Sequence, residues 1–257
     1  MKALIKILTC LLLVVLIENC HAYNEKLINS LEADRIKVQV ISEVYPPYQI
    51  IDEKGELRGW SADKVKLIFT QANIDYSVDI YPWVRAYQLA LTQSNTFIFS
   101  LLRTEERELS FQWVAKLCSI EFSFYRLKGR SDIELQSISD AKKYLIAAQK
   151  GQASTEYLLS LGFETGNNLS ISYNNDNFVQ MLIHDRVELI VLSVPYFQSL
   201  VLNNSPYVKE IEAIFSIDYL RKDLYLAGSL KTSPVLVDKL RRSYLELIPQ
   251  LDPVCHD

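Results

Sequence analysis

The alternation of strand-like and helix-like stretches along most of this chain is the feature that most limits its fold. Residues 36–40 alternate between apolar and polar side chains, which predicts a half-buried strand, and residues 74–80 repeat that period. One helix is expected to begin near Ser61 and a second at Pro82. Residues 97–102 form a short apolar run that fits a buried parallel strand.

The second half of the chain repeats this rhythm. Strands are expected at residues 122–127, 144–148, 189–192 and 224–226, and helices from Gly151 to Gly162, after Asp176 and after Ser233-Pro234. Repeated strand–helix units predict an α/β fold with mostly parallel sheets that are flanked by helices. Ligands of such sheets bind in the loops beyond the carboxyl ends of the strands.

The N-terminus has the pattern of a secretory signal peptide. Lys2 and Lys6 precede the apolar run Ile7–Ile17, and cleavage is expected after Ala22. The alternative is a retained membrane anchor, but this run is short for a bilayer core of about 30 Å. We therefore expect residues 1–22, which include Cys20, to be removed, and we expect the mature chain to be periplasmic.

Residues 23–257 are enough for two domains, and their chemistry argues against several functions. The formal net charge is −4 for the full chain and −5 without Lys2, Lys6 and Glu18 of residues 1–22, which gives no general attraction for nucleic acids or anionic membranes. Cys118 and Cys255 remain after the expected cleavage, and the sequence leaves open whether they form a disulfide or two separate buried thiols.

Signals for an enzyme are weak. His184 and His256 are the only histidines after residue 22, and no Cys/His spacing predicts a zinc site. The chain contains seven glycines, and none of them forms a phosphate-binding loop. We expect no metal, no cofactor and no catalytic residue.

Three loops contain residues suited to ligand binding. Tyr45-Pro46-Pro47-Tyr48 is a rigid aromatic loop at a strand end. Trp83 and Arg85 lie at a helix start, and Ser100, Arg103 and Arg107 follow the third strand, where an arginine can hold a carboxylate. Taken alone, the aromatic loop fits a structural role as well as a binding role, and the other two motifs fit a structural role better.

In order and spacing, these motifs resemble the family 3 extracellular solute-binding proteins, which are periplasmic receptors of ABC importers for polar amino acids. The order is signal peptide, strand, Tyr-Pro-Pro-Tyr, Leu57-Arg58-Gly59-Trp60-Ser61-Ala62-Asp63, helix, strand, Pro82-Trp83, helix, strand, Arg103-Thr104-Glu105-Glu106-Arg107. The resemblance covers about residues 36–247. It implies a two-lobed fold that closes on its ligand, with lobe 1 formed by residues 23–120 plus 221–257 and lobe 2 by residues 121–220.

The resemblance also implies roles for single residues. Arg107 would hold a ligand carboxylate, Tyr45 would stack on the ligand, and Ser100 would lie in the neighbouring loop. The loop Gly151–Thr155, including Ser154, would offer backbone N–H groups to the same carboxylate. The expected ligand-binding residues are Tyr45, Tyr48, Trp83, Arg85, Ser100, Arg103, Arg107, Ser154 and Ser193.

One departure from the family pattern bears on the ligand. Amino acid receptors of this family usually have an Asp where this chain has Ser193, and a hydroxyl does not replace the counter-ion of a buried ammonium. A carboxylate with an uncharged or aromatic body fits better, and Arg85 with Arg103 would suit a dianion. The expected function is capture of a carboxylate-bearing solute by a monomer that delivers it to an inner-membrane permease. The alternatives are a sensing receptor and a dehydratase-like enzyme of the same fold.

Overall fold

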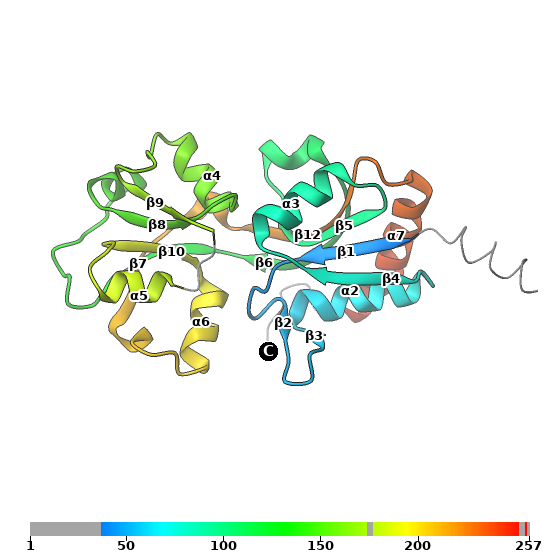
Figure 1. The fold of residues 1–257 in the computed structure, drawn as a ribbon, viewed down its shortest axis with the longest axis horizontal. Coiled ribbons are helices and arrows are strands. Elements are labelled where there is room, and N and C mark those ends of the chain that lie inside the picture. Colours follow the sequence, from blue (N-terminus) through cyan, green and yellow to red (C-terminus); the bar gives the residue numbers. More distant parts are fainter. Residues whose placement is uncertain (1–36, 174–176, 252–254, 256–257) are drawn as a thin grey trace, which may run out of the picture. The chain divides into compact units, whose positions relative to one another are not determined.

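The computed structural model describes residues 37–173, 177–251 and Cys255 (Figure 1). The expected signal peptide, its cleavage after Ala22 and the helix cap at Asp176 lie outside these residues. In the part of the chain that is described, no helix is long and apolar enough to cross a membrane.

One five-stranded sheet, here called sheet 1, has the order β4-β1-β5-β12-β6. All seven residues of its central strand β5 are buried, as expected for a strand that is covered on both faces. β1 runs parallel to β4 and β5, whereas β12 runs antiparallel to β5 and β6. The strands are β1 (Val38–Ser42), β4 (Tyr76–Ile80), β5 (Thr96–Leu102), β6 (Phe111–Ile120) and β12 (Lys222–Ser229).

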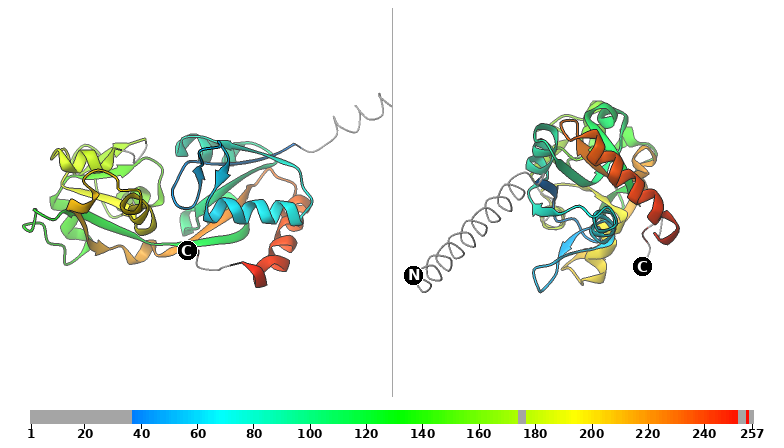
Figure 2. Two further views of the ribbon diagram at one scale, coloured as in Figure 1. Left: turned by 90° about the horizontal axis from the view of Figure 1, so that it is seen from below. Right: turned by 90° about the vertical axis from the view of Figure 1, so that its right-hand side faces the viewer.

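Three helices flank sheet 1, and together with it they make up what we call lobe 1. On one face, Trp83, Ala86 and Ala90 of α3 form an apolar cluster with Ile41 and Ile98. The helices α2 and α7 contribute to a second cluster and lie on the other side of the sheet (Figures 1 and 2). The helices are α2 (Trp60–Gln71), α3 (Trp83–Thr92) and α7 (Pro234–Leu247).

A second five-stranded sheet, sheet 2, has the order β11-β7-β10-β8-β9 and forms lobe 2 with α4, α5 and α6. Its central strand β10 is buried at all five positions. β8 pairs in parallel with β9 and β10, and β7 runs antiparallel to β10 and β11. The elements are β7 (Phe122–Leu127), β8 (Ile146–Gln149), α4 (Ala153–Ser160), β9 (Leu169–Ser172), α5 (Phe178–Ile183), β10 (Leu189–Ser193), α6 (Val194–Leu202) and β11 (Ile211–Ser216).

Short elements complete the described chain. They are β2 (Ile50–Ile51), β3 (Leu57–Arg58) and the 3-10 helices η1 (Glu105–Ser110), η2 (Ile138–Lys143), η3 (Val208–Glu210), η4 (Asp218–Leu220) and η5 (Ile248–Gln250).

The chain passes between the lobes twice, and the two crossings lie side by side. The first joins β6 to β7 at Glu121, and the second joins β11 to β12 through η4. Ile120 is paired with Lys222 in sheet 1, and Ser123 is paired with Ser216 in sheet 2. The two passages therefore form a double connection at which the lobes can rotate.

The predicted two-lobed α/β architecture is confirmed, but each sheet contains two parallel and two antiparallel strand pairs, so neither sheet is mostly parallel. The positions of the crossings explain the antiparallel pairs. β7 and β12 start at the junction between the lobes, where β10 and β5 end, so these strands run against their neighbours.

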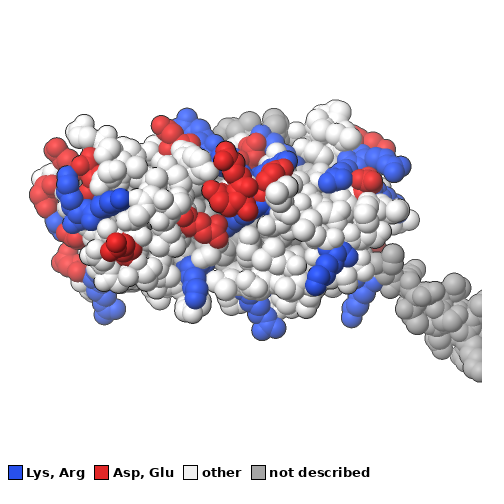
Figure 3. Space-filling model, turned by 90° about the horizontal axis from the view of Figure 1, so that it is seen from above, with Lys and Arg blue, Asp and Glu red and all other residues white. Residues whose placement is uncertain are grey.

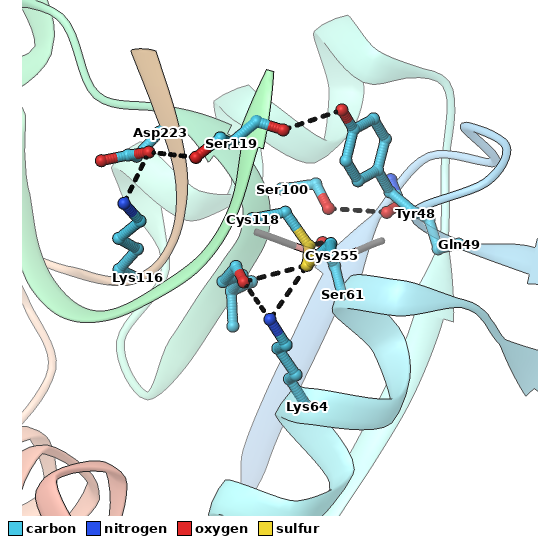
Figure 4. Close-up of a disulfide and its surroundings, with 11 residues drawn as sticks. Tyr48, Gln49, Ser61, Lys64, Ser100, Lys116, Cys118, Ser119, Asp223 and Cys255 are labelled. Atoms are coloured by element: carbon cyan, nitrogen blue, oxygen red, sulfur yellow. Dashed lines mark hydrogen bonds and ion pairs between the residues drawn. A yellow bond between two sulfur atoms is a disulfide. The ribbon is translucent and has the colours of Figure 1, made fainter. Parts of the chain in front are cut away.

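A disulfide ties the end of the chain to the first crossing (Figure 4). Cys118 in β6 and Cys255 are bonded, with an S–S distance of 2.04 Å and a Cα–Cα distance of 5.4 Å. Lys64 of α2 is buried beside the bridge, and its ammonium donates a hydrogen bond to the backbone oxygen of Leu117 at 2.6 Å. Of the two alternatives for these cysteines, a disulfide or two separate thiols, the structure shows the disulfide.

Candidate functional site

A small cavity lies where the two lobes and both crossings meet. Its volume is about 20 Å³, which is room for about one water molecule. A molecule the size of an amino acid therefore fits only after the lobes have moved apart. The lining residues are Glu43, Tyr45, Gln49, Trp83, Ser100, Leu102, Arg107, Ile120, Phe122, Gln152, Ala153 and Leu224.

Arg107 is the buried charge of this cavity. It lies in η1 of lobe 1, directly after β5, and is only 2% exposed. Its Nη2 donates to the Glu156 carboxylate of lobe 2 at 2.8 Å and to the Gly151 backbone oxygen at 3.1 Å. Its Nε has no hydrogen-bond partner among the described residues. A buried guanidinium at a lobe interface has the chemistry needed to hold an anionic group.

Aromatic side chains form a stack across the lobes. Tyr45 from lobe 1 lies between Tyr48 and Tyr196 of α6, with ring centroids at 5.8 and 5.2 Å and nearly parallel planes. The Tyr45 hydroxyl donates to Ser193 Oγ at 2.9 Å. Burial raises the pKa of Tyr45 well above its ordinary value, and the hydrogen bond to Ser193 opposes that shift only in part. Tyr45 therefore acts as a neutral donor.

The start of α2 positions this aromatic loop. The backbone oxygen of Pro47 accepts from Trp60 N, and that of Tyr48 accepts from Ser61 N at 2.9 Å. These bonds satisfy helix N–H groups that would otherwise lack partners. Gly59 sits at the turn with φ of +118°, and a Cβ there would lie 2.6 Å from the Pro47 oxygen. The close approach of the loop to the helix thus depends on a glycine.

Ser100 is held in a strained backbone conformation beside Arg107. Its φ is +55°, in the left-handed region that residues other than glycine rarely adopt. Pairing between β5 and β12 shifts register next to it, so an irregularity in the strand redirects its side chain. The Ser100 hydroxyl donates to Gln49 Oε1 at 2.6 Å, and Gln49 Nε2 donates to Ser42 Oγ at 3.1 Å. This chain of hydrogen bonds fixes two polar groups in the cavity wall, and Figure 4 shows the bond between Ser100 and Gln49.

Glu43, Gln152 and Glu156 were not predicted as site residues. Glu43 follows β1 and accepts from Gln149 Nε2 at 3.0 Å and from Gln152 Nε2 at 2.6 Å, both from lobe 2. The position of Glu43 immediately after β1 was a signal for the site, because ligands of α/β sheets bind beyond the carboxyl ends of the strands. No local pattern marked Glu156, whose partner Arg107 is 49 residues away.

Solved structures with similar folds include two kinds of protein. An ancestral arginine-binding protein bound to arginine matches with a TM-score of 0.71 at 18% identity, over 83% of this chain and 92% of that chain. A histidine kinase sensor domain with similarity to periplasmic binding proteins matches with a TM-score of 0.71 at 14% identity, over 84% and 91%. The arginine-, lysine-, histidine-binding protein ArtJ from the thermophilic bacterium Geobacillus stearothermophilus matches with a TM-score of 0.70 at 16% identity, over 84% and 90%.

This chain has the periplasmic-binding-protein fold. The matches confirm the predicted resemblance to amino acid receptors at the level of the fold, since identities this low show the fold alone. In sequence comparisons, no protein-family model and no curated protein matches the chain.

In this periplasmic-binding-protein fold, four of the predicted site residues line the cavity: Tyr45, Trp83, Ser100 and Arg107. Ser193 lies next to it, where its side chain is fully buried, accepts from Tyr45 and caps α6 by accepting from Tyr196 N. The hydroxyl of Tyr48 points to the Ser119 backbone oxygen at 3.1 Å, outside the lining. Ser154 is buried in the first turn of α4 and is also outside it.

The expected dianion site of Arg85 and Arg103 is not formed. Arg85 is exposed and lies over the Tyr81 ring, with its guanidinium carbon 4.9 Å from the ring centre. Arg103 is held by Glu108 through two hydrogen bonds of 2.8 and 2.6 Å. Glu108 thus holds Arg103 outside the cavity, and Arg107 remains as the one arginine in its lining.

The loop before α4 contacts lobe 1 through a backbone oxygen. The Gly151 backbone oxygen accepts from Trp83 Nε1 at 2.7 Å and from Arg107 at 3.1 Å. The loop therefore presents an acceptor to Arg107 in this structure, and the role of its backbone N–H groups toward a ligand carboxylate stays a prediction.

The surface near the junction shows no single charge sign. Asp and Glu side chains gather near the middle of the face drawn in Figure 3, with Lys and Arg side chains beside and around them. This mixture fits the formal net charge of −4 and gives no basic face for a nucleic acid on that side.

Proposed function

We propose that this chain is an exported receptor that captures a small carboxylate-bearing solute by closure of its two lobes. The observation that carries the proposal is Arg107, a guanidinium that is buried at the lobe junction and bonded across it to Glu156 and Gly151. A ligand carboxylate on Arg107 would contact both lobes, and only a ligand with extra contacts in the closed form favours closure.

Export, the lobe boundaries and delivery of the ligand are predicted from the sequence and belong to the same proposal. Residues 1–22 would direct export and be cleaved after Ala22, and the mature monomer would work in the periplasm. Lobe 1 would consist of residues 23–120 plus 221–257, and lobe 2 of residues 121–220. The ligand would pass to an ABC permease in the inner membrane.

A sensing role is the second candidate, and the match to a histidine kinase sensor domain favours it. The same closure would then report the ligand to a membrane partner. Uptake of radiolabelled ligand by cells with and without this gene separates the two roles, because only an importer component changes uptake.

An enzymatic role has less support. The similar solved structures named above are binding proteins and a sensor domain. No histidine, cysteine or lysine is among the described residues that line the cavity. His184 is exposed at the end of α5, outside that lining.

Calorimetric titration of residues 23–257 tests the proposal. The solutes to be added are amino acids, their keto-acid analogues, dicarboxylates and aromatic acids. We expect micromolar binding of one class, with the solute recovered unchanged. Failure of every carboxylate to bind contradicts the proposed ligand class, and a chemically altered solute contradicts the receptor function.

Two arginine variants make this test specific. R107A should weaken binding by about 30-fold or more, because removing one partner of a buried charged pair costs about 2–5 kcal/mol. R85A removes the same charge from an exposed position outside the cavity lining and should leave the affinity within about twofold.

A further inference from the structure

The anion that Arg107 binds in this structure belongs to the chain itself. The Glu156 carboxylate of lobe 2 lies 2.8 Å from Arg107 Nη2. The aromatic rings of Trp83 and Tyr87 lie next to each other against the guanidinium, with ring centres 5.9 and 5.1 Å from its carbon. A cation that contacts aromatic rings and a carboxylate is an anion-binding arrangement, and Glu156 occupies its anionic position.

The two partners differ in their freedom to leave the pair. The side chain of Arg107 is 2% exposed, whereas that of Glu156 is 42% exposed. Glu156 also lies in the first turn of α4, at the surface end of the contact. The Glu156 carboxylate can therefore rotate into the solvent at a small cost in free energy, whereas the Arg107 guanidinium cannot. Exchange of the anion thus takes place by movement of Glu156 away from Arg107.

We propose that Glu156 is an internal substitute for a ligand carboxylate: it occupies Arg107 when the lobes close, and a ligand carboxylate has to displace it. The inference rests on the proposed function and adds a regulatory residue to that site. Arg107 and Glu156 come from different lobes, so the pair exists only while the lobes are in contact.

Glu156 then has two opposing effects. It favours closure in the absence of solute, because it neutralises a buried cation that would otherwise lack an anion. It also lowers the affinity for any carboxylate, which has to compete with a group held at high local concentration. Neutral contacts across the lobes, such as Tyr45 to Ser193, do not compete in this way.

The distance between the lobes measures this competition without any need to know the natural ligand. Spin labels at V235C in α7 and L202C in α6 suit the purpose, because these side chains are 77% and 74% exposed and lie in different lobes. Cys118 and Cys255 are bonded to each other and do not take up the label. Double electron–electron resonance on residues 23–257 then gives the populations of closed and open forms.

E156A should lower the closed-to-open ratio by about tenfold, the change expected when one charge-assisted hydrogen bond is lost. Sodium acetate should restore much of the closed population in E156A, because a free carboxylate then takes the vacated place on Arg107. Sodium chloride at the same concentration should not. E105A is the matched control. Glu105 is an exposed acid in η1, and among the described contacts it makes no hydrogen bond to the Arg107 guanidinium. The E105A variant should therefore leave the inter-lobe distances unchanged.

Two results would overturn the inference. Distances in E156A that match those in E105A would show that the ion pair does not hold the lobes together. Wider distances that acetate and chloride affect equally would show that a free carboxylate does not take the place of Glu156. Neither result bears on binding measured by calorimetry, so failure of the inference and failure of the proposed function remain distinguishable.

Discussion

Arg107 carries a charge in a nearly dry position, so its surroundings must compensate that charge while the lobes are in contact. In the closed form the compensation comes from Glu156, from the Gly151 backbone oxygen and from two aromatic rings. A charge buried in this way is stable only with such partners, and removal of one of them leaves an expensive imbalance. The cavity is thus organised around a single guanidinium and the group that neutralises it.

The pKa of Glu156 reports on this pair. Burial raises the pKa above its ordinary value, and the attraction of Arg107 opposes that rise. R107A should therefore raise the pKa of Glu156 further, because the opposing charge is removed. A carbon-detected NMR titration of the Glu156 carboxyl group measures the change. An unaltered or lower pKa in R107A, at inter-lobe distances that match those of the wild type, would mean that the two groups are not paired in solution.

The same shift sets the sign of a pH effect on stability. The folded-state pKa of Glu156 is raised, so its contribution is fully present below the unfolded pKa and is lost as the pH rises through the folded pKa. Wild type should therefore gain stability relative to E156Q as the pH is lowered from 7 to 4. Urea unfolding of both proteins at the two pH values measures this difference, and the opposite sign would contradict the direction of the shift.

At the scale of elements, the loop Tyr45–Tyr48 and the start of α2 form one unit that depends on Gly59. G59A combines a backbone strain of about 1–3 kcal/mol with a clash of the new Cβ against the Pro47 oxygen, and should destabilise the fold by more than about 3 kcal/mol. G55A is the matched control, because Gly55 also has positive φ, at +79°, but has no atom within 4 Å of the new Cβ. It should cost about 1–2 kcal/mol. Equal urea midpoints for the two variants would contradict the close contact.

The disulfide also acts at the scale of elements, because it covalently links residues that are 137 positions apart in the sequence. The double variant C118S/C255S should lose about 2–5 kcal/mol of stability, since the bridge restricts a long loop of the unfolded chain. Denaturant unfolding in oxidising buffer measures the loss, and reduction of the wild type should reproduce it. A midpoint that neither treatment changes would show that the bridge contributes nothing to stability.

Local periodicity predicted much of this fold, and contacts between distant residues account for what it missed. The helices at 60–71, 83–92 and 234–247 followed from apolar spacing and from their prolines and caps. β6 and β11 were not predicted, because these strands are defined by antiparallel partners far along the chain. The sequence placed Arg107 correctly after the third strand, but its pairing with Glu156 depends on how the lobes meet.

At the scale of the whole molecule, the site is made by two lobes and two adjacent crossings, so its geometry depends on their rotation. The closed form leaves about 20 Å³ between the lobes, and binding of any larger solute has to be coupled to opening. Under the proposed function, the solute shifts the populations of open and closed forms.

The most direct test of this account is the inter-lobe distance between spin labels at V235C and L202C during titration with carboxylate solutes. The account predicts two distances in solution, with one class of carboxylate changing their populations in wild type and failing to do so in R107A. Populations that no solute in the panel changes, or that change equally in R107A, would contradict capture of a carboxylate on Arg107 by movement of the lobes.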